Sequence, residues 1–289
     1  MHKLLQSFAL QLFLVAVGTV SGSAALAAKP STNTPPAPTV SWADLADLAD
    51  SAPLVLRAQV RKQVRVEPER SNGVRIGWAR FYFEAKTLSL LAGDNVVRET
   101  LRYLGDLPLD ARGKAPSLAK KQVLLFASMA PTGPMPQRDS ELRLAAPDAQ
   151  VLWDPLSETR LRSILPQLLS PDAPPRVTGV REAINVAGDL AGQSETQIFL
   201  SARDNGAAAI SVTRRPGMAP AWGVSFSEAA EGGLPPPRES LRWYRLACFL
   251  PPVLPRGANL SESAGEKAQA DADYRLVMGE LGACLRLRR

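Results

Sequence analysis

Apolar and polar residues alternate with a period of two over much of the first half of the chain. In the run 55–66 the apolar side chains on alternate positions are Ala58, Val60, Val64 and Val66, with arginines between them. A period of two places successive side chains on opposite faces, so this pattern is typical of a strand with one buried face. Similar or continuously apolar runs follow at 74–91, 96–104 and 123–126. The first half therefore predicts four or five antiparallel strands.

A helical pattern precedes these strands. The apolar positions of its inward face are Trp42, Leu45 and Leu48. Ser41 is a favourable N-cap, and the carboxylates of Asp44 and Asp47 suit the positive end of a helix. Pro53 ends the pattern. One helix followed by four or five strands predicts a small, twisted antiparallel barrel or sandwich, and the order of elements resembles that of OB-like barrels without sharing a motif with them.

The second half mixes helical and strand periods. Strands are predicted at 150–153, 197–202, 208–213 and 222–226. A helix with an apolar face at Leu161, Ile164, Leu165 and Leu168 lies between the first two of them, and we expect Pro166 to bend or fray it. A last helix begins near Ser263, where Glu266 completes a capping box, and ends at Gly282. The fold class expected for the whole chain is α+β, with a second mixed domain that carries a C-terminal helix.

Composition divides the chain into four parts. A short basic start, an apolar run and the small-x-small sequence 25–27 form the pattern of a secretion signal over 1–27. Residues 28–40 are rich in Pro and Thr and predict a flexible leader. The Pro-rich segment 131–139 predicts a boundary between a β-rich domain, 41–130, and a mixed domain, 142–289. The asparagine–glycine pair at 72–73 is the strongest hairpin signal.

The N-terminal run has a second interpretation, a membrane anchor. A spanning helix needs about 20 predominantly apolar residues, and this run is shorter and turns polar before the cleavage site. No later segment is long and apolar enough to span a membrane. We therefore expect removal of the signal after Ala27, no remaining transmembrane segment, and a periplasmic or secreted protein.

The chain has two cysteines, Cys248 and Cys284. In an exported protein such a pair predicts one disulfide, and a loop of about 37 residues makes it worth about 4 kcal/mol in the chain-entropy estimate. A redox pair of the thioredoxin type would place the cysteines two residues apart. The structural interpretation is preferred, with the bridge holding the C-terminal helix and tail to the segment around Trp243.

The chain is mildly basic. It has 34 Lys and Arg against 28 Asp and Glu, and removal of the signal would leave 33 basic residues and a net charge of +5. The local basic groups are Lys120 and Lys121, Arg214 and Arg215, and the tail Arg286, Arg288 and Arg289. Because these groups are small and the other positive charges are spread along the chain, we expect no nucleic-acid binding. The net positive charge predicts a weak attraction to anionic envelope surfaces.

The only histidine is His2, within the predicted signal. The mature chain would contain no imidazole, which excludes Ser-His-Asp and Cys-His nucleophiles and His-ligated zinc. No metal or cofactor is expected. Ser117 and Lys120 match the S-x-x-K pattern of β-lactamases, but the other elements of those enzymes are missing, so a solvated turn is expected.

Carboxylate chemistry needs no histidine. Candidate acids in the loops of the second domain are Asp189, Glu195 and Asp204. A hydrolase that uses such a pair on cell-wall or carbohydrate material is therefore the alternative function.

Recognition is the leading hypothesis. Arginine and aromatic side chains that lie close in sequence in the second domain are Arg214, Arg215, Trp222, Arg242, Trp243, Tyr244 and Arg245. Such residues are enriched at the anchors of interfaces. The competing interpretation places the tryptophans in the core and pairs the arginines with acids. The sequence thus predicts a non-enzymatic module that binds an envelope protein or an anionic surface polymer.

Overall fold

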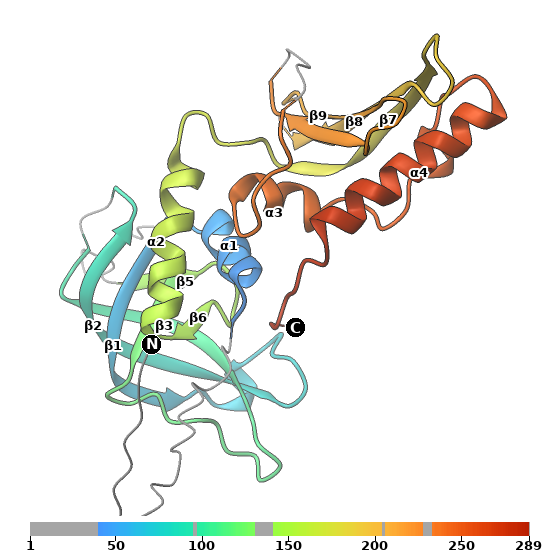
Figure 1. Ribbon diagram of the computed structural model, residues 1–289. Helices are drawn as coiled ribbons and strands as arrows, with labels where there is room; N and C mark the ends of the chain where they lie inside the picture. Colours follow the sequence, from blue (N-terminus) through green and yellow to red (C-terminus); the bar gives the residue numbers. More distant parts are fainter. Residues whose placement is uncertain (1–39, 95–96, 131–140, 204–205, 228–232, 289) are drawn as a thin grey trace, which may run out of the picture. The chain divides into compact units, whose positions relative to one another are not determined.

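The computed structural model describes residues 40–94, 97–130, 141–203, 206–227 and 233–288 (Figure 1). The elements of its first part are α1 (Trp42–Ser51), β1 (Leu54–Arg65), the 3₁₀ turn η1 (Pro68–Arg70), β2 (Trp78–Ala92), β3 (Thr100–Pro108), β4 (Gln122–Met129), β5 (Glu141–Leu144) and β6 (Gln150–Leu152). Then follow α2 (Pro155–Leu169), β7 (Val177–Ala187), β8 (Ser194–Ala202), β9 (Ala209–Arg214), β10 (Ala221–Ser225), α3 (Leu241–Ala247), the turn η4 (Arg256–Ala258) and α4 (Ala264–Leu281). The predicted α+β class is confirmed.

Two helices begin and end as their sequences predict. The Ser41 hydroxyl accepts a hydrogen bond from the backbone of Asp44, whose carboxylate accepts one from the backbone of Ser41, so α1 begins with a capping box. Ser263 and Glu266 form the same arrangement at α4, which Gly282 ends with a positive φ. These boundaries depend on bonds within one turn.

Five of the first six strands form a barrel. The order is β1-β2-β3-β5-β4, and β1 pairs with β4 to close it. Within the described residues one pair of this barrel, β3 with β5, is parallel and the others are antiparallel. This connectivity is that of an OB-like barrel, as the order of elements predicts. β6 extends the sheet by pairing with β4 beside β5.

The structure corrects several details of the predicted barrel. β5 has no counterpart among the predicted strands, because four residues are too short to show a period. β6 matches the strand predicted for the second domain, yet it pairs with β4. β3 begins at Thr100 rather than at 96. The connection between β1 and β2 spans 66–77, so the pair at 72–73 does not make a two-residue hairpin. The segments 1–39 and 131–139 lie outside the described residues.

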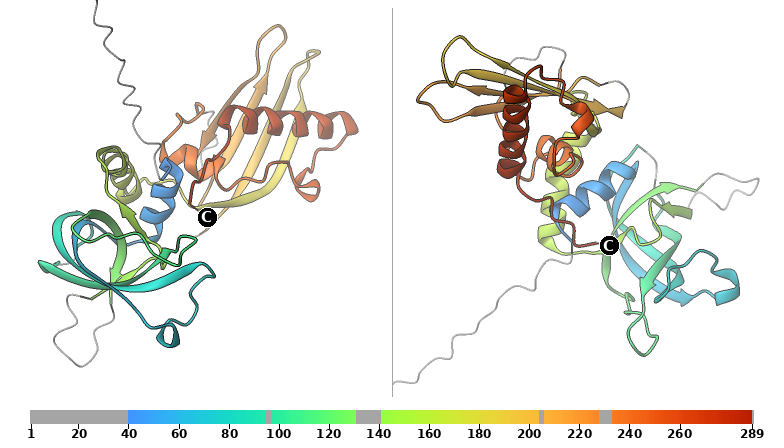
Figure 2. Two further views of the ribbon diagram at one scale, coloured as in Figure 1. Left: turned by 90° about the horizontal axis from the view of Figure 1, so that it is seen from below. Right: turned by 90° about the vertical axis from the view of Figure 1, so that its right-hand side faces the viewer.

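The remaining strands form an antiparallel sheet of order β10-β9-β8-β7, packed against α4 (Figure 2). β7 has no counterpart among the predicted strands. Its pairing with β8 shifts register between Val177 and Gly179 and again between Val180 and Glu182, and such bulges disturb the alternation that a sequence pattern depends on. The helix α2 continues past Pro166 to Leu169.

The apolar residues form two cores. One fills the barrel, with side chains such as Leu56, Phe83 and Leu101 fully buried. The other joins α1 to α2, α3, α4 and the second sheet. β4 contributes to both: Leu125 points into the barrel, whereas Leu124 and Phe126 belong to the second core. Burial on both faces explains the continuous apolar run of this strand.

Candidate functional site

The aromatic residues of the predicted binding set are part of the core. Trp222, Trp243 and Tyr244 are all buried. The indole N–H of Trp243 donates to the carbonyl oxygen of Leu281 at 2.9 Å, and that of Trp222 donates to the carboxylate of Glu280. These rings hold α3 and the second sheet to α4. They are not exposed to a partner.

Two arginines of the same set form internal ion pairs. Arg214 approaches the fully buried Asp273, with 2.7 Å between Nε and Oδ1. Arg245 is only 3% exposed and donates two hydrogen bonds to Asp50, at 2.7 and 2.9 Å. Bidentate pairing with a carboxylate is the geometry that a guanidinium favours. Both guanidinium groups are therefore paired with acids inside the protein.

Arg215 and Arg242 are the exposed members of the predicted set. The structure places the other five in the core or in ion pairs with internal acids, so the seven do not form one surface. Whether Arg215 and Arg242 take part in binding stays a prediction.

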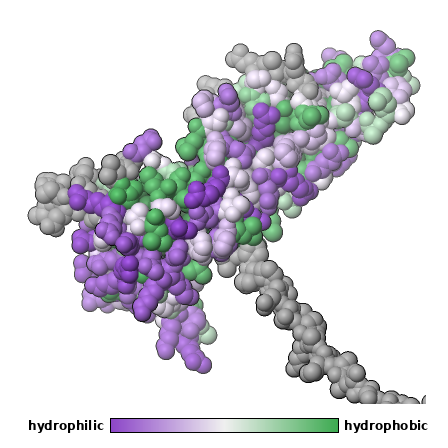
Figure 3. All heavy atoms as spheres, turned by 60° about the vertical axis from the view of Figure 1, so that its left-hand side comes forward, coloured by the Kyte–Doolittle hydropathy of each residue, from purple (hydrophilic) through white to green (hydrophobic). Residues whose placement is uncertain are grey.

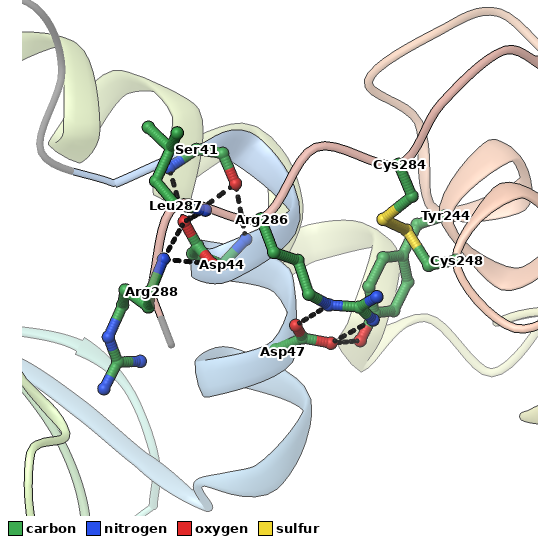
Figure 4. Close-up of polar contacts among 9 residues, drawn as sticks. All are labelled: Ser41, Asp44, Asp47, Tyr244, Cys248, Cys284, Arg286, Leu287 and Arg288. Atoms are coloured by element: carbon green, nitrogen blue, oxygen red, sulfur yellow. Dashed lines mark hydrogen bonds and ion pairs between the residues drawn. A yellow bond between two sulfur atoms is a disulfide. The ribbon is translucent and has the colours of Figure 1, made fainter.

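The acids of α1 hold α3 and the C-terminal tail (Figure 4). The Tyr244 hydroxyl donates to Asp47 at 2.6 Å, and Arg286 forms an ion pair with the same carboxylate, with 2.6 Å between Nε and Oδ2. The carboxylate of Asp44 accepts from the backbone N–H of Leu287 at 2.9 Å. Asp44 thus serves the capping box and the tail together. The tail lies against the helix that begins the described chain.

The third acid of α1, Asp50, is shared by two arginines. Arg176 is 3.1 Å from its carboxylate and Arg245 is closer. Burial alone would raise the pKa of Asp50, but the hydrogen bonds and positive charges of Arg245 and Arg176 outweigh it and lower that pKa. The carboxylate is ionised at neutral pH and stabilises the junction between α1, α3 and the start of β7.

The predicted disulfide is confirmed. Cys248 and Cys284 are bonded, with their Cα atoms 5.1 Å apart. Cys248 follows α3 and Cys284 follows α4, so the bridge joins the ends of these helices just before the tail that contacts α1 (Figure 4).

The candidate acids for a hydrolase lie at the surface where they are described. Asp189 and Glu195 are exposed, and Glu195 accepts a hydrogen bond from the side chain of Gln197. Asp204 lies outside the described residues. Among the residues that the structure describes, no three His, Cys, Asp or Glu side chains are grouped to hold a metal ion. In the same residues no helix has the length and apolar character needed to cross a membrane.

A different set of cations gathers on the barrel, and we call it the basic surface. Its members come from the second half of β1 and from the loop before β4: Arg61, Lys62, Arg65, Arg112, Lys114, Lys120 and Lys121. All seven are exposed, and none of them forms an ion pair with a residue that the structure describes. In Figure 3 hydrophilic side chains cover most of the barrel, in the lower part of the view.

Hydrogen bonds hold the loop beside β1. The backbone of Val60 donates to the carbonyl of Lys121 at 3.0 Å and accepts from the N–H of Lys120 at 2.8 Å. Further along, Gln63 accepts from the backbone of Leu118 at 2.8 Å. The loop therefore runs alongside the strand, and cations that are 60 residues apart in sequence become neighbours.

The basic surface reflects an uneven distribution of charge along the chain. Residues 54–129 contain 14 Lys and Arg against 7 Asp and Glu, whereas residues 141–289 contain 17 of each. The expectation that positive charge is dispersed is therefore wrong. Counting charge over the predicted strands alone would have indicated this excess from the sequence, because the predicted domain 41–130 also includes the three acids of α1.

The barrel also has a groove of about 730 Å³, whose lining includes none of the seven cations. It lies where β5 leaves β3: the two strands pair at Arg102 with Glu141 and at Tyr103 with Leu142, after which β5 pairs with β4. Its lining includes two side chains of the outer face of β2, Arg80 and Tyr82.

The sequence matches no protein-family model. No curated protein shows significant similarity to it either.

Proposed function

We propose that the protein binds an anionic polymer through the basic surface of the barrel. The observation that supports this most directly is the group of seven exposed cations without an ion-pair partner among the described residues. The proposal keeps the class of function that the sequence favours, a binding module, and moves the binding surface from the second region to the barrel.

The physical basis is electrostatic. A polyanion that lies across several Lys and Arg side chains releases the counterions condensed on it, and this gives binding that weakens steeply with salt. A surface with an excess of positive charge also attracts the polymer before contact and increases the rate of association. For a protein exported as its N-terminal sequence predicts, an anionic polymer of the cell envelope is the proposed partner.

The test compares two triple variants of equal charge. Arg61→Ser with Lys120→Ser and Lys121→Ser removes three cations of the basic surface. Arg215→Ser with Arg242→Ser and Arg256→Ser removes three exposed arginines of the second region. Binding of fluorescent polyphosphate is measured by anisotropy over a series of salt concentrations.

We expect the barrel variant to lower the slope of log affinity against log salt by about 2 to 3, because each lost contact retains one counterion. The control variant should keep the slope of the unmodified protein. Equal losses in the two variants would show attraction by net charge alone and contradict the proposal. Unchanged binding by the barrel variant would contradict it as well.

A further inference from the structure

The groove has an apolar floor that continues toward the basic surface. On the outer face of the barrel Val64 is the partner of Tyr82 in the β1–β2 pairing, and Tyr82 is the partner of Leu104 in the β2–β3 pairing. Val64 and Leu104 are 43% and 51% exposed. Neighbouring strands lie about 4.8 Å apart, so the row spans about 10 Å. It links the strand that carries Lys62 to the strand that carries Arg102.

Charged side chains flank this floor in a second row. Lys62 pairs with Glu84 across β1 and β2, Glu84 with Arg102 across β2 and β3, and Arg102 with Glu141 across β3 and β5. Cation and anion therefore alternate over four adjacent strands. The row offers hydrogen-bond donors and acceptors along one side of an apolar strip.

Two guanidinium groups of the groove are available to a ligand. Arg102 and Arg143 are exposed and form no ion pair with any described residue. Arg80 differs, because its guanidinium makes two hydrogen bonds with the buried Asp106, at 2.8 and 3.1 Å. Arg80 lines the groove with its guanidinium already bound to an acid. Arg102 and Arg143 are free to bind carboxylates in the bidentate manner.

We propose that the anionic polymer is an acidic polysaccharide, with sugar rings packed on Tyr82 and Leu104 and sugar carboxylates paired with Arg102 and Arg143. This inference rests on the proposed function and names its ligand. A sugar unit combines an apolar ring face with hydroxyl groups and, in an acidic sugar, a carboxylate. The apolar row, the mixed-charge row and the free guanidinium groups match these three features.

Other polyanions fit the groove less well. A polyphosphate chain has no apolar face to cover Val64, Tyr82 and Leu104. A lipid chain would place hydrocarbon beside the charges of Arg102 and Glu141, which are costly to remove from water. The groove thus adds selectivity to the general attraction of the basic surface.

The experiment measures the affinity of the purified protein for a uronic-acid polysaccharide and for polyphosphate, at one salt concentration. Tyr82→Ala should weaken polysaccharide binding about tenfold, the size of effect seen for an aromatic anchor, and leave polyphosphate binding unchanged. Tyr82→Phe keeps the ring and should bind both polymers like the unmodified protein. Arg102→Ser with Arg143→Ser should lower binding of the polysaccharide more than that of polyphosphate.

Additional ligands separate the possible outcomes. A neutral dextran should bind at least tenfold more weakly than the uronic polysaccharide, because it lacks carboxylates for the two arginines. If Tyr82→Ala lost affinity for both polymers equally, the proposal that the groove binds sugar would be wrong. Tighter, Tyr82-dependent binding of a single-stranded oligonucleotide or of anionic phospholipid vesicles would overturn it as well.

The two proposals fail in different ways. If the proposed function is wrong, Arg61→Ser with Lys120→Ser and Lys121→Ser leaves the binding of both polymers unchanged. If the polymer-binding function is right and only the choice of a polysaccharide is wrong, the triple variant lowers both affinities. Tyr82→Ala then changes the affinities for the polysaccharide and for polyphosphate by the same factor.

Discussion

Arginines of the basic surface and arginines at the contacts of the second region and tail have opposite roles in this molecule. In the second region Arg214 and Arg245 are held by Asp273 and Asp50, and the tail residue Arg286 is held by Asp47. On the barrel, Arg61 and Arg65 are exposed and form no ion pair with a described residue. The side chain is the same, and what differs is whether a carboxylate forms an ion pair with it.

The charge of each region explains the difference. Residues 141–289 carry equal numbers of acidic and basic residues, and α1 adds three acids, which bond to Arg245, Arg286 and the backbone of Leu287. Residues 54–129 have twice as many basic as acidic residues. We infer that cations of the second region and tail contribute to stability, whereas cations of the barrel surface contribute to binding. Four predictions test this comparison.

The largest effect is expected from loss of the disulfide. Cys248→Ser with Cys284→Ser opens a loop whose ends are 36 residues apart and should lower the free energy of unfolding by about 4 kcal/mol. Urea denaturation measures the change. Polyphosphate binding at a temperature where the variant is folded should stay the same. If the free energy of unfolding fell by less than about 1 kcal/mol, the noncovalent contacts of the tail, and not the bridge, would stabilise this part of the protein.

Removal of the charge of Asp50 should have the next largest effect. Asp50→Asn leaves Arg245 buried without its counter-charge, and breaking such a pair from one side costs about 3 kcal/mol. Asp172→Asn alters an exposed acid, and we expect a change within about 0.5 kcal/mol. Thermal and urea unfolding compare the two variants. Similar small effects in both would contradict a structural role for Arg245.

The same ion pair predicts how stability depends on pH. The pKa of Asp50 is lowered in the folded protein, so its contribution to stability is complete above the ordinary value of 3.8 and is lost as pH falls through the lower folded value. The free energy of unfolding, measured over a series of acidic buffers, should fall less steeply below pH 3.8 in Asp50→Asn. Equal slopes would show that other groups carry the acid sensitivity.

The smallest effect on stability is expected on the barrel. Arg61→Ser with Lys120→Ser and Lys121→Ser should change the free energy of unfolding by less than about 0.5 kcal/mol per site. A slight increase is expected, because three like charges no longer repel one another. Differential scanning calorimetry provides the measurement. A large destabilisation would mean that these side chains support the fold, and the comparison between the two regions would not hold.

Features that depend on a few neighbouring residues could be predicted from the sequence. The caps at Ser41 and Ser263 concern hydrogen bonds within one turn, and the structure contains both. The buried strand around 123–126 could be predicted from its apolar run alone. The disulfide could be predicted from the presence of two cysteines. The strands β5 and β7 could not be predicted, because one is too short and the other too irregular to show a period.

The site was more difficult to predict than the fold. The patterns around Trp222 and Trp243 are equally typical of an interface and of a core, and burial decides between them. For the cations of the barrel, the signal was the ratio of basic to acidic residues in one segment. The cluster itself exists because the loop before β4 returns to lie along β1.

The sequence by itself determined the α+β class, the helix ends, the closing strand of the barrel and the cysteine pair, since each follows from local hydrogen bonding, from periodicity or from the number of cysteines. Only the tertiary structure decided which arginines are free. Arg245 meets Asp50 across 195 residues, and Arg286 meets Asp47 across 239. Sequence patterns describe what a side chain can do, whereas its partner depends on how distant segments pack together.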